Sequence, residues 1–237
     1  MRIPTVTKNL LIINAIAFFA MYVFQMRGVD LNGILGLHFF KAPDFHVYQL
    51  VTYMFMHANF SHILFNMFAL WMFGMTIERV MGEKRFLTYY LVCGIGAGLI
   101  QELVQLISFY VQGLAAYQTV NIDGHTVIAM SQFLNSWTTV GASGAIYGIL
   151  LAFGMIFPNE RIFIFPLPIP IKAKWFITFY VVLELVSGIA SYGNDNVAHF
   201  AHLGGMLFGY LLIRYWQKGR GRRNYYDDMG PIGRFFR

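Results

Sequence analysis

The sequence predicts an all-α polytopic membrane protein, built as a six-helix transmembrane bundle. Hydrophobic residues make up 57% of its 237 residues and charged residues only 12%, which lies outside the composition of soluble globular domains. Apolar runs recur along almost the whole chain, and several approach the roughly 20 residues that a spanning helix needs. We therefore expect one membrane domain that uses nearly every residue.

Six apolar segments are the candidate spans, at residues 9–27, 59–77, 86–107, 142–157, 173–191 and 198–216. The fourth is noticeably short. Around this domain at 9–216 we expect a cytoplasmic N-terminus at 1–8 and a basic cytoplasmic tail at 217–237. The first span follows a basic start, but it lacks a convincing small-residue cleavage site, so we expect a retained helix rather than a signal peptide.

The distribution of basic residues predicts the orientation. With the N-terminus in the cytoplasm, all but two of the 17 Lys and Arg residues lie in inside segments, the exceptions being Arg27 and Lys41. The positive-inside rule then selects an even number of spans with both termini cytoplasmic. Orientation accounts for the formal net charge of +6, and we expect no nucleic-acid partner.

Three polar side chains from different spans are predicted at nearly one depth in the bilayer. Counting at about 1.5 Å per residue from the inner boundary places Asn66 roughly 20 Å, Ser143 roughly 22 Å and His202 roughly 18 Å above it. The hydrocarbon core is about 30 Å thick. Because polar groups at such depth usually face the bundle interior and mark function, we expect these three to meet.

Ser143 begins the short fourth span between Gly141 and Gly144. It can cap the helix, and the glycines can serve a close helix contact. It can also be a nucleophile, because His202 shares a helix face with Gly205 and the sixth span can therefore approach the fourth. A serine hydroxyl and a general base must come within about 2.6–3.2 Å.

His62 and Asn66 lie four residues apart on one face of the second span. Their side chains can donate hydrogen bonds to the oxyanion of an acyl-transfer intermediate, together with the backbone N–H of Ser143. The alternative is ordinary hydrogen bonding between helices.

We expect no acidic residue at the depth of the His202 imidazole. Glu184 is the only acid deep in a span, and a structural hydrogen bond is its expected role. The pattern therefore favours a Ser-His dyad over a triad.

Three motifs thus fall on three of the expected spans: His62-x-x-x-Asn66 on the second, Gly141-x-Ser143-Gly144 on the fourth, and His202 followed by Gly204 and Gly205 on the sixth. In this order and on these spans they resemble the motifs of the rhomboid family of intramembrane serine proteases. The resemblance covers about residues 50 to 212. The tryptophan-arginine pair common in the family's first outside loop is missing here, which leaves open how this loop is anchored.

The resemblance implies hydrolysis of a peptide bond in or near a transmembrane segment of a single-span or polytopic membrane-protein substrate. Ser143 would be acylated, and neither a metal nor another cofactor is implied. Tyr147 matches a position where the family places an aromatic ring beside the histidine, which would hold the imidazole in place of an acid. The six-span form resembles bacterial members, so we expect a multi-pass protein of the bacterial inner membrane.

Hydrolysis at this depth needs water, and a polar cavity between helices is tolerated in a bilayer. We expect the site to be reached from the outer aqueous phase. Substrate entry would then involve movement of the fifth span or of residues 187–197.

Two other functions fit parts of the sequence. His57, His62, His199 and His202 could bind a metal in a transporter or metalloprotease. Against this, the chain has no His-Glu-x-x-His motif, its single cysteine (Cys93) excludes a cysteine-based site, and we expect no carboxylate beside the histidines. The other possibility is a protease-like binding protein without catalysis, which retention of the serine, histidine and asparagine argues against.

Overall fold

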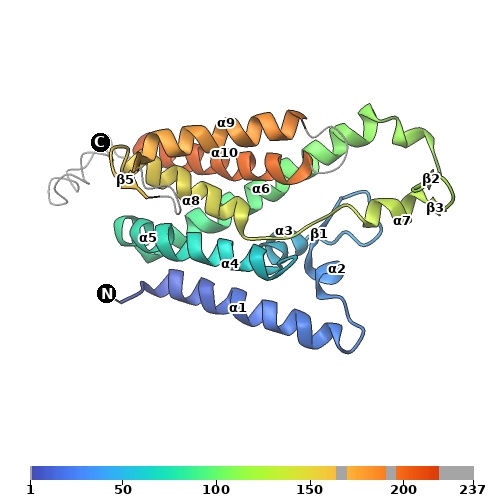
Figure 1. Ribbon diagram of the computed structural model, residues 1–237, viewed down its shortest axis with the longest axis horizontal. Coiled ribbons are helices and arrows are strands. Elements are labelled where there is room, and N and C mark those ends of the chain that lie inside the picture. The colour runs from blue at the N-terminus through green and yellow to red at the C-terminus, as the bar shows by residue number, and fades with distance from the viewer. Residues whose placement is uncertain (1, 164–169, 191–195, 219–237) are drawn as a thin grey trace.

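The computed structural model describes residues 2–163, 170–190 and 196–218, and it is predominantly helical (Figure 1). Its main helices are α1 (Thr5–Gln25), α4 (Phe60–Ala69), α5 (Met75–Met81), α6 (Glu83–Val111), α8 (Ser143–Ile156), α9 (Ala173–Ala190) and α10 (Asn196–Lys218). The shorter helical elements are α2 (Leu31–Leu35), α3 (Gln49–Thr52), η1 (Tyr53–Phe55), η2 (Leu70–Gly74), η3 (Leu114–Ala116) and α7 (Met130–Asn135).

Among the described residues, three small antiparallel sheets lie in the connections between helices. The pairs are β1 (Leu37–His38) with β4 (Thr138–Thr139), β2 (Thr119–Asn121) with β3 (Val127–Ala129), and β5 (Arg161–Ile162) with β6 (Ile171–Lys172). The expected tail lies outside the described residues beyond position 218, and so do positions 191–195 of the expected moving segment.

Each of the six expected spans contains a helix in its described part. By length and composition, three of the helices described could cross a membrane, namely Thr5–Gln25, Phe60–Met81 and Glu83–Val111, and α8 is a shorter apolar helix. The long helices run side by side, and α1 begins at the end of the bundle where α10 ends (Figure 1). The count of six spans and the location of the termini stay predictions.

The helix from Phe60 to Met81 combines α4, the π-helical turn η2 and α5. Asn59 caps its first turn, since the side-chain oxygen of Asn59 accepts a hydrogen bond from the His62 N–H at 2.8 Å. The helix ends at Gly82, whose φ of +78° favours glycine. A tight turn therefore leads directly into α6.

Glu78 fixes the start of α1 against α5. Its carboxylate accepts hydrogen bonds from the backbone N–H groups of Val6 (2.9 Å) and Thr7 (2.7 Å) and from the Thr7 hydroxyl (2.7 Å). The residue before the helix is Pro4, which provides no side-chain cap. The negative charge thus satisfies the unpaired donors of a helix N-terminus.

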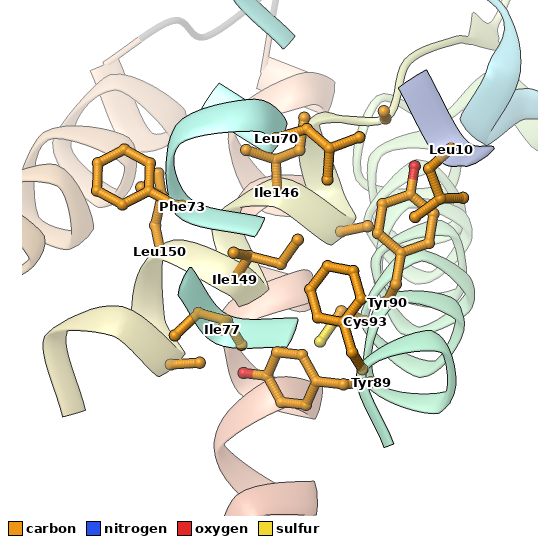
Figure 2. Packing of buried hydrophobic residues seen from close by; sticks show 14 of the residues in the cluster. Leu10, Leu70, Phe73, Ile77, Tyr89, Tyr90, Cys93, Ile146, Ile149 and Leu150 are labelled. Atoms are coloured by element: carbon orange, nitrogen blue, oxygen red, sulfur yellow. The ribbon is translucent and has the colours of Figure 1, made fainter. Parts of the chain in front are cut away.

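The main hydrophobic core lies between α6, α8 and the Phe60–Met81 helix (Figure 2). Tyr89, Tyr90 and Cys93 of α6 face Ile146 and Ile149 of α8 across this core (Figure 2). The buried thiol has no disulfide partner, which confirms that the single cysteine packs in the core.

Glycines allow α8 and α10 to touch through their backbones. A Cβ atom at Gly205 would lie 1.9 Å from the Gly144 carbonyl oxygen, and one at Gly148 would lie 3.2 Å from the Gly205 oxygen. The sequence predicted this close approach of the fourth and sixth spans. It brings the first turn of α8 next to the first half of α10.

The connection between α1 and α4 is anchored by polar contacts of His38 and Glu102. The His38 Nδ1 atom lies 2.9 Å from the backbone oxygen of Asn135, and its Nε2 atom lies 2.6 Å from the backbone oxygen of Gly33. The Glu102 carboxylate accepts a hydrogen bond from the Phe40 N–H at 2.7 Å. These contacts hold the loop in a chain that lacks the tryptophan-arginine pair.

We expect Gly205→Ala to lower the melting temperature in detergent by about 5 °C or more. The added methyl group would overlap the Gly144 carbonyl, and overpacking of this kind typically costs about 1–3 kcal/mol. Gly33→Ala is the matched control, because the three atoms nearest to its Cβ would belong to the Asp30 side chain, at 2.9 Å or more, and not to a backbone. An equal melting temperature for the two variants would contradict the proposed backbone contact.

Candidate active site

Ser143 is the first residue of α8, and its hydroxyl lies against the imidazole of α10. The Ser143 Oγ and His202 Nε2 atoms are 2.8 Å apart. Ala142 precedes the helix, and no side chain caps its first turn. The hydroxyl therefore bonds to His202 instead of capping the helix, and the predicted serine-histidine contact is present.

Gly141 shapes the backbone that leads into Ser143. Its φ is +130°, a conformation that residues with a Cβ rarely adopt. A Cβ atom here would also lie 2.8 Å from the His62 ring. The Gly141 N–H donates a hydrogen bond to the backbone carbonyl oxygen of Tyr53 at 2.9 Å. Any larger residue at this position would displace either His62 or the start of α8.

Tyr147 stacks on the His202 ring, as the resemblance to the rhomboid family implied. The ring centroids are 4.1 Å apart and the ring planes are inclined by 9°. The two residues come from helices in backbone contact, so the stack fixes the rotation of the imidazole about its bond to α10. Its Nε2 atom is thereby held toward Ser143.

The expectation that no acid reaches His202 is wrong. Glu184 of α9 places its Oε1 atom 3.1 Å from His202 Nδ1. The Nδ1 atom is buried without a well-directed hydrogen bond, so this contact is chiefly electrostatic. Tyr147 supplements the acid rather than replacing it.

The Glu184 carboxylate is shared by three side chains. Besides its contact with His202, it accepts a short hydrogen bond from the Tyr147 hydroxyl, and its Oε2 atom lies 2.5 Å from His199 Nδ1. Burial of a carboxylate is costly unless hydrogen bonds compensate it. The three neighbours supply that compensation, which explains how a 7% exposed acid is tolerated among apolar helices.

The contacts of His202 favour a proton on Nδ1. A carboxylate beside Nδ1 stabilises an N–H there, and the lone pair of Nε2 then accepts the Ser143 hydroxyl proton. This is the arrangement in which an imidazole acts as a general base toward a serine.

His62 and Asn66 of α4 lie near Ser143, since the His62 ring adjoins Gly141 and Asn66 lines the same pocket as the serine. The Asn66 amide nitrogen donates to the His62 carbonyl at 2.7 Å and retains a second hydrogen for another acceptor. The Nδ1 atom of His62 accepts a hydrogen bond from the Ala58 N–H at 3.3 Å, so its proton lies on Nε2. Two side-chain donors are therefore available near the start of α8.

His57 packs edge-on against His62, with ring centroids 5.1 Å apart. Burial, and to a lesser extent the neighbouring His62, lower the pKa of the His57 imidazole to about 4. The ring is therefore neutral at neutral pH. It supports the position of His62 without adding charge to the site.

A pocket of about 800 Å³ adjoins the serine and lies between α4, α8 and α9. Ser143 and Asn66 are among its few polar lining residues, whereas Phe65, Phe176 and Tyr180 belong to its apolar and aromatic walls. The pocket therefore combines a reactive hydroxyl with a surface suited to apolar chains.

Residues 44–218 match the Rhomboid domain family. The chain belongs to this family. It is similar to "Rhomboid protein 1, mitochondrial" of Saccharomyces cerevisiae, with 30% identity over 187 residues, which cover 77% of this chain and 45% of that protein. The "Putative rhomboid protease YdcA" of Bacillus subtilis is 30% identical over 167 residues, covering 70% of this chain and 65% of its own length. The "Rhomboid protease AarA" of Providencia stuartii is 31% identical over 165 residues, covering 67% and 52%.

This rhomboid chain spans about half to two thirds of the length of these relatives. Two of these relatives are bacterial proteins, and the third is a mitochondrial protein of yeast. Membership of the family therefore supports an integral membrane protein but does not select one membrane.

The histidines do not form one four-membered cluster in this rhomboid. His57, which precedes α4, packs against His62 in α4. His199 and His202 lie on α10 beside Glu184. In the described part of the chain, Glu184, His199 and His202 are the group whose ligand atoms lie within 4.8 Å of one another. The expectation that no carboxylate accompanies the histidines is therefore wrong.

Glu184 was expected to make only a structural hydrogen bond, although its position in the sequence indicates a place in the site. Glu184 lies 12 positions after Lys172, the basic residue that directly precedes α9 and that the sequence predicts at the inner boundary. At 1.5 Å per residue this is roughly 18 Å, the height predicted for His202. The same count that grouped the other three residues would have included the acid.

We expect Tyr147→Ala to slow labelling of Ser143 by a fluorophosphonate at least tenfold, because the imidazole loses both its stacked ring and the Tyr147 bond to Glu184. Tyr147→Phe keeps the ring and should slow labelling less. Tyr210→Ala is the control, since Tyr210 lies on α10 with 44% exposure. Wild-type labelling by the alanine variant at position 147 would show that the stack does not orient His202.

Proposed function

We propose that this protein is an intramembrane serine endopeptidase that hydrolyses peptide bonds in or near transmembrane segments of membrane-protein substrates. The observation that carries this proposal is the 2.8 Å contact between Ser143 Oγ and His202 Nε2 beside an apolar pocket. The names of the two bacterial relatives, "Putative rhomboid protease YdcA" and "Rhomboid protease AarA", support the same reaction.

In the acylation step, Ser143 Oγ attacks the substrate carbonyl carbon while His202 Nε2 takes the hydroxyl proton. His202 then gives this proton to the leaving amine. In the second step a water molecule attacks the acyl-enzyme with His202 again as base, and Ser143 is released. Glu184 stays ionised and stabilises the imidazolium formed in both steps.

Three donors are suited to the oxyanion. The backbone N–H of Ser143 is in the first turn of α8, where N–H groups have no acceptor within the helix. The Asn66 amide and the His62 Nε2–H add side-chain donors. Loss of one such donor typically lowers kcat by about 10²–10³.

The substrate in this proposal is a membrane protein with one or several spans. The lining of the pocket is mostly apolar and aromatic, so it suits an apolar segment entering from the bilayer between α4 and α9. Water reaches Ser143 from the outer aqueous phase. The six-span topology with cytoplasmic termini and the bacterial inner membrane are part of this proposal.

We expect Ser143→Ala to abolish cleavage of a single-span substrate in proteoliposomes, because no other group replaces the nucleophile. A fluorophosphonate should label the wild type at Ser143, and His202→Ala should prevent labelling. An unchanged melting temperature would show that both variants are folded. Undiminished cleavage by the Ser143 variant would refute the proposed nucleophile.

Glu184 acts as a positioning residue in this mechanism, and Glu184→Gln tests that role. We expect kcat to fall about 10- to 100-fold at unchanged KM, since the imidazolium loses its counter-charge but the substrate pocket is preserved. Glu184→Asp should recover part of the loss. A rise in KM at unchanged kcat, or a fall in melting temperature alone, would assign the carboxylate a structural role instead.

A further inference from the structure

The Glu184 carboxylate has more partners than the orientation of one imidazole requires. The contact with His202 alone would orient and stabilise the catalytic imidazole, yet His199 lies one helical turn earlier and contacts the same carboxylate. The Glu184 Oε2 to His199 Nδ1 distance is 2.5 Å, and the Glu184 Oε1 to His202 Nδ1 distance is 3.1 Å. Two imidazole nitrogens and a carboxylate thus converge between α9 and α10.

This donor set matches the ligand chemistry of Zn²⁺. Zinc in proteins prefers imidazole nitrogen at about 2.0–2.1 Å and carboxylate oxygen at about 2.0–2.2 Å, usually with four ligands. Donor atoms on one tetrahedral ion lie about 3–3.5 Å apart by that geometry. The three ligand atoms here already lie within 4.8 Å of one another. Small rotations of the side chains would place them around one ion.

The neighbourhood supplies the remaining requirements. The His199 side chain is 26% exposed and the His202 side chain 18%, whereas Glu184 is 7% exposed. An ion can therefore reach the imidazoles, while the buried carboxylate balances its charge. The Tyr147 hydroxyl, already bonded to Glu184, or a water molecule can complete the coordination.

We propose that Glu184, His199 and His202 form an inhibitory Zn²⁺ site that switches off the catalytic base. The inference rests on the proposed protease function. Zinc binds the lone pair of His202 Nδ1, so the single proton of the neutral ring moves to Nε2, which faces Ser143. The charge of the bound zinc ion opposes a second positive charge on the imidazole ring. The ion also binds the Glu184 carboxylate. Nε2 can then no longer accept the serine proton.

The ligand set also predicts which ions act. Mg²⁺ and Ca²⁺ prefer oxygen ligands and gain little from two imidazoles. Zinc should therefore inhibit at concentrations where magnesium and calcium have no effect.

The test uses the full chain in proteoliposomes, freed of metal with a chelator and assayed with a single-span substrate during titration with ZnCl₂. We expect cleavage to fall at least tenfold, and a chelator to restore it. Relative to its own rate without zinc, His199→Ala should need at least tenfold more zinc for inhibition. His125→Ala, which changes an exposed loop histidine, should respond as the wild type does. Equal sensitivity of the His199 variant and the wild type would overturn the site.

A binding measurement separates this inference from the proposed function. Ser143→Ala keeps all three ligands, so it should bind one zinc ion per chain, measured by equilibrium dialysis and metal analysis. Adding His199→Ala to it should weaken binding at least tenfold. Zinc binding by an inactive wild type would refute the protease but keep the ligand site. Cleavage without zinc binding would refute the site and keep the protease.

Discussion

The backbone contact between Gly144 of α8 and Gly205 of α10 is the constraint on which the site depends. No side chain separates the helices there, since a Cβ at Gly205 would fall 1.9 Å from the Gly144 oxygen. Ser143 and His202 extend from these two helices just beyond the contact. Their 2.8 Å separation therefore follows from how closely the backbones pack, and the stack of Tyr147 on His202 follows from the same proximity.

Acidic groups inside the bundle differ in the number of hydrogen-bond donors around them. Glu78 receives three hydrogen bonds from Val6 and Thr7, and Glu184 is shared by a tyrosine and two histidines. Glu102 has one donor, and its other oxygen is buried without a hydrogen bond. Glu78 joins two helices and Glu184 joins three, so each carboxylate also fixes helix positions that apolar packing leaves adjustable.

The sequence predicted depth better than direction. Rise per residue is nearly constant in a helix, so counting placed Asn66, Ser143 and His202 at one level, and the structure brings them around one site. Glu184 was left out of that count although it lies at the same level, and depth alone would not have shown that it faces His202, because the rotation of a helix about its axis is set by tertiary packing. The β1–β4 pairing was also unpredicted, because two-residue strands about 100 positions apart leave no local pattern.

Helix α9 couples the pocket to the base. It contributes Phe176 and Tyr180 to the pocket and Glu184 to His202. A displacement of α9 that widens the pocket therefore also changes the 3.1 Å distance between Glu184 and His202. Tyr147 stays on the imidazole during such a movement, because it belongs to α8 and not to α9. Tyr147 of α8 thus orients the imidazole ring by stacking, whereas Glu184 of α9 stabilises its charge. Only the charge stabilisation depends on the position of α9.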